Sequence, residues 1–457
     1  MLDITKLQPG TKLYFLGIGG ISMSALALIL NSRGFVIRGY DRAQSEVTDG
    51  LEEHGVNVDF AFDGTEAGGC GAIVYSAAFG ETHPVLVAAR KTGIPMYSRA
   101  ELLGGIAYAY KNSVAVAGTH GKSTTSGMLG HIFLNAAGCD PTVIVGAVMR
   151  DVGSTYRLGG DGNFIFEACE YRDSFLSFFP RVAVVLNVAL DHTDYFKDIG
   201  QMRDSFTRFM NNAGRDGYAV YNLDCENSRI AAKDVAAHKI TFSAGGDESA
   251  DYYAKNVKET EGRSEFDVYR RGEYLYTLKP GAPGRHNVAN SLAAAAVCDI
   301  SGISAQDTVN GIAGFTGVGR RFEYLGGFRG ARVYDDYAHH PDEIKATLAT
   351  AREIAGEHKV FCVFQPHNYS RLRDLYGDFI TAFGDADKLI LCPLYAAREK
   401  SDGAVSSETL AALIDGAEYY TDYGEITARL EKLVSADDIV IIMGAGDISK
   451  YAERFKK

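Results

Sequence analysis

The sequence has no tryptophan and only seven cysteines in 457 residues. The cysteines are odd in number, scattered and never closely paired, so the sequence supports neither a disulfide framework nor a zinc ribbon. The longest apolar run, near residues 25–30, is too short to cross a bilayer, and the N-terminus lacks the basic-then-apolar order of a secretory signal. These absences predict a cytoplasmic protein with no membrane partner.

Basic residues are also in deficit, because 46 Lys and Arg face 58 Asp and Glu for a net charge of −12. This balance disfavours nucleic acid as a partner, so any anionic ligand needs a local site. The length is too great for one compact core. We expect three domains over residues 1–107, 108–318 and 319–457, because new strand patterns restart after about residue 110 and again after Arg321.

The fold class predicted from the sequence is α/β. Short apolar runs alternate with helical patterns, and glycine often stands where a strand should end, which is typical of parallel sheets with right-handed crossovers. Strands are expected at residues 13–16, 36–39, 73–75, 114–117, 164–166, 182–186 and 360–364, and helices at residues 22–31, at residues 126–137 and from Pro341 onward.

A glycine-rich loop follows the expected strand at residues 114–117 and leads into a helix. Glycines let backbone N–H groups converge on phosphate oxygens, Lys122 can neutralise the terminal phosphates, and the Ser123 hydroxyl can ligate magnesium. The competing interpretation is a plain strand-to-helix turn, and Val116 stands where the longer phosphate-loop pattern has its first glycine. We predict an ATP and Mg²⁺ site formed by Gly118, Thr119, His120, Gly121, Lys122, Ser123 and Thr124.

A second glycine-rich turn, Gly17 to Gly20, follows the first expected strand, and the next strand ends near Asp41. A pyrophosphate at the helix start with Asp41 on a ribose is one interpretation, and a tight turn without a ligand is the other. Further carboxylate and imidazole candidates follow central strands at Glu167 and at Asp191 and His192, where they can reach a magnesium ion near the phosphates.

Taken together and in order, these strings resemble the Mur ligase superfamily over nearly the whole chain. The resemblance is carried by GIGGISMSALA, GTHGKSTT, EACE, NVALDHTDYF, GRHNVAN, GVGRRFE, YDDYAHHPDE, FQPHNYSR and GAGD. It implies a Rossmann-like domain for a UDP-sugar, a central phosphate-loop ATPase domain with a parallel or mixed sheet, and a C-terminal Rossmann-like domain that brings an amino acid. The implied activity is ATP-dependent joining of L-alanine to the lactyl carboxylate of UDP-N-acetylmuramate through an acyl phosphate, by a monomer or homodimer in the cytoplasm.

The resemblance also implies roles for single residues. Gly19 and Gly20 would hold the UDP diphosphate, with Asp41 and Ser76 near the rest of that nucleotide. On the ATP side, the roles fall to Ser123, Glu167 and His192 for the metal, Asn287 and Asn290 for adenine, Arg320 or Arg321 for the γ-phosphate, and Asp336 and His339 in the C-terminal domain. His367 and Arg371 would receive alanine. Cys169 and Asn368 depart from the family pattern, where Asp and Arg are usual.

Three other functions compete with this interpretation. A ligase of the same superfamily that adds a whole tripeptide to the same sugar nucleotide is separated poorly by sequence. An NAD-linked oxidoreductase explains the first glycine turn and Asp41 but leaves Lys122 without a role. A GTPase-like switch explains Lys122, but the sequence has no Asn-Lys-x-Asp string to read guanine.

Overall fold

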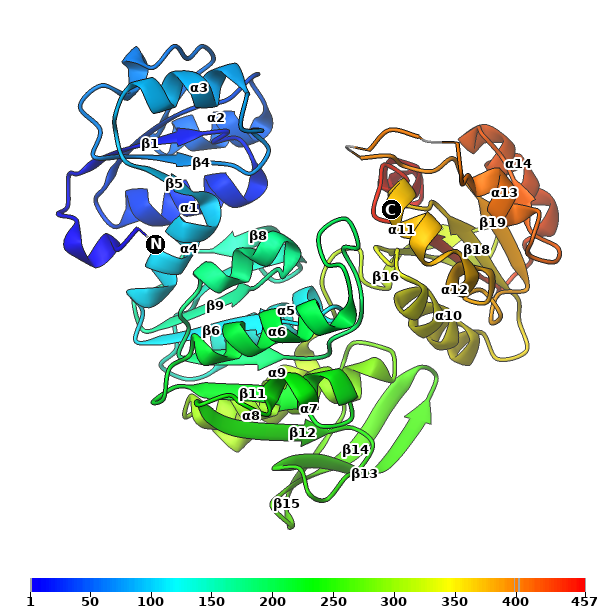
Figure 1. The fold of residues 1–457 in the computed structure, drawn as a ribbon. Coiled ribbons are helices and arrows are strands. Elements are labelled where there is room, and N and C mark those ends of the chain that lie inside the picture. The colour runs from blue at the N-terminus through cyan, green and yellow to red at the C-terminus, as the bar shows by residue number, and fades with distance from the viewer. Residues whose placement is uncertain (1, 398, 402, 457) are drawn as a thin grey trace.

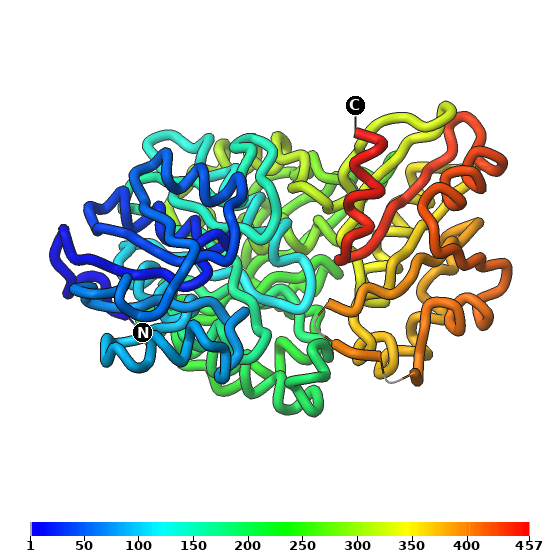
Figure 2. Tube along the Cα trace, turned by 90° about the horizontal axis from the view of Figure 1, so that it is seen from above, coloured from blue at the N-terminus to red at the C-terminus, as the bar shows by residue number. Residues whose placement is uncertain are grey.

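The computed structural model describes residues 2–397, 399–401 and 403–456, and it builds them around three β-sheets with helices packed on them (Figure 1). The chain passes from an N-terminal body through a central body to a C-terminal body, and the view from above shows the three in a row (Figure 2). A search of these described residues finds no helix of the length and apolarity that a membrane crossing needs.

The N-terminal sheet has five strands in the order β3-β2-β1-β4-β5, all parallel. Its first strand is fully buried from Leu13 to Leu16, as expected where helices cover both faces of a parallel sheet. The strands are β1 (Lys12–Leu16), β2 (Val36–Tyr40), β3 (Asn57–Asp59), β4 (Ala72–Tyr75) and β5 (Met96–Ser98). The helices are η1 (Ile4–Lys6), α1 (Ile21–Ser32), α2 (Glu46–Glu53), η2 (Thr65–Ala67), α3 (Pro84–Lys91) and α4 (Arg99–Tyr108).

The central sheet has ten strands in the order β15-β14-β13-β12-β11-β10-β6-β9-β7-β8. Pairing is parallel from β13 to β7 and antiparallel at both edges. Its strands are β6 (Asn112–Ala117), β7 (Thr142–Met149), β8 (Ser154–Arg157), β9 (Asn163–Glu167), β10 (Val182–Val185), β11 (Tyr218–Asn222), β12 (His238–Ser243), β13 (Tyr252–Thr260), β14 (Arg263–Arg270) and β15 (Glu273–Leu278). Its helices are α5 (Lys122–Asn135), η3 (Tyr171–Ser177), α6 (Ile199–Asn211), α7 (Glu226–Ala232), α8 (His286–Ile300) and α9 (Ala305–Gly314).

The C-terminal sheet has six strands in the order β16-β17-β21-β18-β19-β20, and only β16 runs antiparallel to its neighbour. Its strands are β16 (Glu323–Phe328), β17 (Ala331–Asp336), β18 (Val360–Phe364), β19 (Lys388–Leu391), β20 (Glu418–Tyr419) and β21 (Ile439–Met443). Its helices are α10 (Pro341–Ala355), α11 (Tyr369–Asp374), α12 (Tyr376–Ile380), α13 (Ser407–Ala411), α14 (Tyr423–Leu433), α15 (Ser449–Ala452) and η4 (Glu453–Phe455).

The predicted α/β class is confirmed, and each expected strand is present within one or two residues of its expected bounds. The helix expected at residues 126–137 was placed too late, because α5 begins at Lys122 and ends at Asn135. Gly121 caps it with φ +84°, a left-handed backbone that glycine adopts without a steric penalty, so Lys122 and Ser123 lie in the first helical turn. The central sheet is mixed, which the family resemblance allowed, but the individual strands β13–β15 of its antiparallel edge were not predicted.

Candidate active site

Hydrogen bonds to the segment after β10 hold the phosphate loop in its conformation. Thr119 exchanges hydrogen bonds with the backbone of Ala189, and the His120 N–H donates to Asn187 Oδ1 at 2.8 Å. A Cβ on Gly118 would lie 3.1 Å from the Asn187 nitrogen, and one on Gly121 would lie 2.8 Å from Asn290 Oδ1. Both glycines are therefore required by close approach as well as by their positive φ angles.

Lys122 makes a buried ion pair at the start of α5. Its ammonium donates to the carbonyl oxygens of Gly118 and Thr119 and lies 3.1 Å from Glu170 Oε2. Burial alone would lower the pKa of Lys122, but the Glu170 carboxylate raises it above its ordinary value. The same pairing lowers the pKa of Glu170 against the opposing effect of burial. A fixed positive charge is thus ready where the glycine loop would receive phosphate.

The expected metal ligands Ser123, Glu167 and His192 lie around this ion pair. Ser123 Oγ donates to Glu167 Oε2 at 2.8 Å, and the Gly146 N–H donates to the same oxygen at 2.9 Å. His192 Nε2 lies 3.6 Å from Glu170 Oε1, so Glu170 connects the imidazole to Lys122. Hydroxyl and carboxylate oxygens are the ligands that Mg²⁺ prefers, and Ser123 and Glu167 present both kinds side by side, so this donor set fits the ion.

A cavity of about 270 Å³ extends from the phosphate loop into the junction between the central and C-terminal sheets. Asn287 and Asn290 line it beside the apolar side chains of Leu186 and Phe242. The Asn290 amide donates to Asn287 Oδ1 at 2.9 Å, and this bond leaves the Asn290 oxygen beside Gly121. An apolar slot with a few fixed amides matches the shape and chemistry of a purine base.

The C-terminal domain supplies one wall of the cavity, and the two expected arginines lie differently with respect to it. Arg321 lines the cavity, whereas Arg320 is bound to Asp335 Oδ2 at 3.0 Å and to the Gly444 carbonyl oxygen. Asp336 also lines the cavity, where its carboxylate accepts the N–H groups of Phe322 and Ala338. Burial raises the pKa of Asp336 to about 6.

Glu343, at the start of α10, interacts with three side chains of the candidate site, and the sequence analysis did not single it out. Its carboxylate lies 3.2 Å from His120 Nδ1, 3.2 Å from His339 Nδ1 and 3.8 Å from an Arg321 nitrogen. Burial would raise its pKa, but His339 and His120 hold that pKa well below its usual range. Glu343 therefore joins the phosphate loop to the C-terminal wall.

Arg371 is a second link between the same two domains. Its Nε and one terminal nitrogen donate to Asp191 Oδ1 at 3.2 and 3.1 Å, and both side chains are buried. Burial would raise the pKa of Asp191, but the Arg371 guanidinium holds it well below its usual range. The arginine expected to bind a carboxylate ligand is thus already paired with a carboxylate of the protein. Its other terminal nitrogen lies 3.4 Å from His367 Nδ1.

The two remaining histidines of the expected set lie together on the C-terminal side. The rings of His339 and His367 are 5.9 Å apart, and His367 stacks on Tyr395. Burial, with the nearby His339 and Arg371, lowers the pKa of His367 to about 3, and burial lowers that of His339. Both rings are therefore neutral at pH 7.

The carboxylate of Asp41, which follows β2, organises the N-terminal glycine turn at residues 17–20. Asp41 Oδ2 accepts the Gly19 N–H at 2.8 Å, and a Cβ on Gly19 would lie 2.9 Å from the same oxygen. Gly20 caps α1 without a side-chain hydrogen bond. Ser76 lies against the turn, because a Cβ on Gly17 would be 3.4 Å from its Cβ. The residues expected to hold the UDP diphosphate are therefore together, with Asp41 facing the turn's backbone.

Arg99, at the start of α4, is a residue of this region that the sequence analysis missed. Its guanidinium donates to Ser22 Oγ at 3.1 Å, in the first turn of α1, and no carboxylate lies within 4.0 Å of it in the part of the chain that the structure describes. Burial lowers the pKa of Arg99, with an opposing effect from Cys169 of the central domain. Nothing local marks Arg99, because its partners are far away in the sequence.

Comparison with known proteins gives a consistent result along the chain. Three family models match: "Mur ligase family, catalytic domain" over residues 12–111, "Mur ligase middle domain" over residues 116–298, and "Mur ligase, glutamate ligase domain" over residues 320–446. The chain is 39% identical to the UDP-N-acetylmuramate–L-alanine ligase of Clostridium perfringens, covering 100% of this chain and 98% of that protein. It is 42% identical to the ligase of the same name from Caldicellulosiruptor saccharolyticus, covering 97% of each.

Solved structures give the same fold. The UDP-N-acetylmuramate-alanine ligase of Thermotoga maritima matches with a TM-score of 0.77 at 27% identity and covers 97% of this chain and 98% of that one. A murein peptide ligase from Psychrobacter arcticus matches with a TM-score of 0.69 at 22% identity, with 98% of each chain covered. The second match speaks for the fold alone.

Proposed function

The chain belongs to the Mur ligase family, and we propose that it joins L-alanine to the lactyl carboxylate of UDP-N-acetylmuramate with ATP as the energy source. The observation that carries the proposal is the buried pair that Lys122 makes with Glu170. Lys122 lies in the same loop-and-helix segment as His120, Gly121 and Thr124, which line the cavity. A fixed ammonium at a helix start is what a transferring phosphoryl group needs. The full-length relatives supply the identity of the two substrates.

ATP would bind with its base in the cavity beside Asn287 and Asn290 and its phosphates at the loop from Gly118 to Thr124. Arg321 would meet the terminal phosphate, and this choice over Arg320 is supported by its position on the cavity wall and by the engagement of Arg320 with Asp335. Ser123 and Glu167 would hold Mg²⁺, with His192 next to them, and the ion would supply charge neutralisation of the phosphates. Asp336 and His339 would line the C-terminal side of the same nucleotide site.

The chemistry follows from the low reactivity of a carboxylate toward an amine. The lactyl carboxylate oxygen would attack the γ-phosphorus in line, the bond to the β-phosphate oxygen would break, and ADP would leave. Lys122 and Arg321 would stabilise the charge on the phosphoryl oxygens. The alanine nitrogen would then attack the acyl carbon and expel phosphate, which forms the amide and releases one proton.

The other two substrates would approach from opposite domains. The UDP diphosphate would rest on the α1 start at Gly19 and Gly20, with Ser76 and Arg99 beside it. Alanine would enter near His367, His339 and Arg371, where one guanidinium nitrogen is not engaged by Asp191. We therefore propose that residues 1–107 bind the UDP-sugar, residues 108–318 bind ATP and residues 319–457 bind the amino acid, and that the protein acts as a cytoplasmic monomer or homodimer.

The test is phosphate release from ATP with UDP-N-acetylmuramate and one acceptor at a time: L-alanine, glycine, L-serine or the tripeptide L-alanyl-γ-D-glutamyl-diaminopimelate. We expect turnover with L-alanine, confirmed by mass spectrometry of the amide product. If the tripeptide is the only acceptor that supports phosphate release, the protein is instead a muropeptide-recycling ligase, which adds a whole tripeptide to this sugar nucleotide. Reactions that lack the sugar nucleotide give the background rate.

A further inference from the structure

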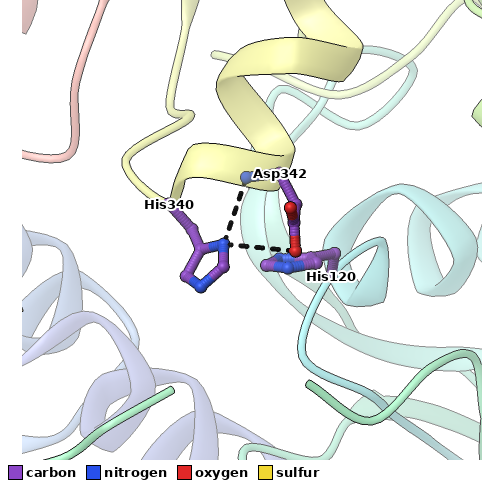
Figure 3. Close-up of side chains that lie close together, drawn as sticks. All are labelled: His120, His340 and Asp342. Atoms are coloured by element: carbon purple, nitrogen blue, oxygen red, sulfur yellow. Dashed lines mark hydrogen bonds and ion pairs between the residues drawn. The ribbon is translucent and has the colours of Figure 1, made fainter. Parts of the chain in front are cut away.

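Two histidines and an aspartate from different domains meet at the mouth of the nucleotide cavity (Figure 3). His120 lies in the phosphate loop, His340 caps α10, and Asp342 lies in the first turn of α10. One ring nitrogen of each histidine and one Asp342 carboxylate oxygen lie within 4.8 Å of one another, and the two ring centroids are 4.8 Å apart. The adenine-nucleotide site described above assigns no role to His340 or Asp342.

Glu343 fixes the ring of His120. Its carboxylate lies 3.2 Å from Nδ1, so Nε2 is the ring nitrogen left for a further ligand. That Nε2 is buried and makes no hydrogen bond among the described residues. A buried polar atom without a partner is costly, and a carboxylate behind an imidazole is the arrangement that orients metal-binding histidines.

His340 is the second imidazole, and its side chain is buried. Its Nε2, like that of His120, makes no hydrogen bond among the described residues. Its Nδ1 accepts the Asp342 N–H at 3.2 Å and lies 3.7 Å from Asp342 Oδ2. The helix cap accounts for one nitrogen of His340, but it does not account for the two imidazoles facing each other across a domain junction.

The remaining distances are within reach of a metal ion. Tetrahedral Zn²⁺ with bonds of about 2.0–2.1 Å places its ligand atoms roughly 3.3 Å apart. The three groups must therefore close by about 1.5 Å at most, and the Asp342 side chain, which is 58% exposed, is not held by core packing. Imidazole nitrogens favour Zn²⁺, Ni²⁺ or Co²⁺ over Mg²⁺.

We propose that His120, His340 and Asp342 bind a divalent transition-metal ion of the zinc class, separate from the magnesium site at Ser123 and Glu167. Three protein ligands leave one coordination position for water, and His120 and Asp342 both line the nucleotide cavity. The ion joins the phosphate loop to α10, so it holds the central and C-terminal domains together when no nucleotide is bound. It also occupies the entrance to the cavity and therefore competes with ATP.

The experiment uses the full chain, freed of metal by a chelator and without nucleotide, and titrates it with Zn²⁺ in excess Mg²⁺ against a chromophoric zinc indicator. We expect one saturable site, weakened at least about tenfold in both Asp342→Asn and His340→Asn, as for loss of a metal-site group. The matched control is Asp151→Asn, which removes the carboxylate of another histidine–aspartate pair, His131 and Asp151, and should leave Zn²⁺ affinity unchanged. Circular dichroism checks that each variant is folded.

Co²⁺ distinguishes this site from cysteine binding. Ligation by nitrogen and oxygen gives only weak visible bands, whereas any of the seven cysteines would add an intense thiolate charge-transfer band in the near ultraviolet. We expect the weak bands alone, and their loss when ADP is added. Absence of a saturable site, equal affinity in Asp342→Asn and wild type, a thiolate band, or displacement by Mg²⁺ would each overturn the proposal. None of these readouts depends on ligase turnover, so the proposed function is tested separately.

Discussion

The chain contains two strand–glycine–helix turns, one at the start of α1 and one at the start of α5, and they reach an anion site by different means. Both helices are capped by glycine, with no side-chain hydrogen bond and no acidic residue in the first turn. Most longer helices of the described chain are instead capped by Ser, Asp or His side chains, as α4, α6, α10 and α14 are. Uncapped N–H groups at a helix start are free to bind an anion, so both turns share this feature.

The two turns differ in where their positive charge comes from. The α5 turn carries its own cation, Lys122, five residues after the end of β6. The α1 turn has none and instead receives Arg99 from α4, through Ser22. A cation that is adjacent in sequence to its loop, such as Lys122, can be predicted from a sequence motif. A cation that another helix brings to the loop, such as Arg99, cannot be predicted in this way. The predictions below test whether each cation has the role that this comparison assigns to it.

The largest effect is expected at Lys122. Lys122→Ala should lower kcat for phosphate release by roughly 10³-fold or more, the scale of losing a charged group that stabilises phosphoryl transfer. UDP-N-acetylmuramate binding, measured by calorimetry, should be little changed because that ligand sits on the other turn. Lys122→Ala leaves the buried Glu170 carboxylate without its partner, which destabilises the fold. The double variant Lys122→Ala/Glu170→Gln removes that buried charge, so it tests the loss of the lysine in a protein that should still fold. Lys239→Ala, an exposed lysine of the same domain, is the control. Near-normal turnover in Lys122→Ala would contradict the proposal that Lys122 stabilises the transferring phosphoryl group.

The second largest effect is expected at the Arg371–Asp191 ion pair, which links the C-terminal domain to the central domain. Arg371→Met should lower the free energy of unfolding in urea by about 3–5 kcal/mol, because it leaves Asp191 buried and unpaired. Arg371→Met/Asp191→Asn should recover most of that loss. The folded-state pKa of Asp191 is depressed, so the pair stabilises the fold above the ordinary carboxyl pKa and the effect fades as pH falls below about 4. A loss that is independent of pH would contradict the ion-pair explanation.

These two predictions show what the sequence does and does not contain. Lys122 and Ser123 directly follow a glycine-rich loop at the start of one helix, so glycine spacing and the helical pattern were enough to predict a phosphate site there. Arg371 and Asp191 are 180 residues apart, and Glu343 meets His120 across 223 residues. Such contacts leave no periodicity in the chain, and they depend on how the domains pack. The start of α5 was misplaced for a local reason, because Gly121 was taken as loop when it is the cap.

Arg99 should give an intermediate effect. Arg99→Met should raise KM for UDP-N-acetylmuramate by roughly 10- to 100-fold, because a charge-assisted hydrogen bond contributes about 1.5–3 kcal/mol. KM for ATP should not change. The variant should be no less stable than wild type, since no carboxylate is left unpaired, and a purely structural arginine would not behave this way. Arg90→Met, which breaks a surface pair with Glu81 in the same domain, is the matched control. An unchanged KM for the sugar nucleotide would remove Arg99 from that site.

The smallest effect is expected at Asp41, and it separates two roles for that carboxylate. In the structure it accepts the N–H groups of Gly19 and Arg42, so it shapes the turn from behind. Asp41→Asn keeps one acceptor for Gly19 and should change KM for the sugar nucleotide by no more than about threefold, within the roughly 0.5–1.5 kcal/mol of one hydrogen bond. A carboxylate that bound the ribose hydroxyls directly would lose a charged contact, and KM would rise tenfold or more. Steady-state kinetics with Asp41→Asn therefore decides whether the α1 turn uses its acidic residue as a support or as a ligand.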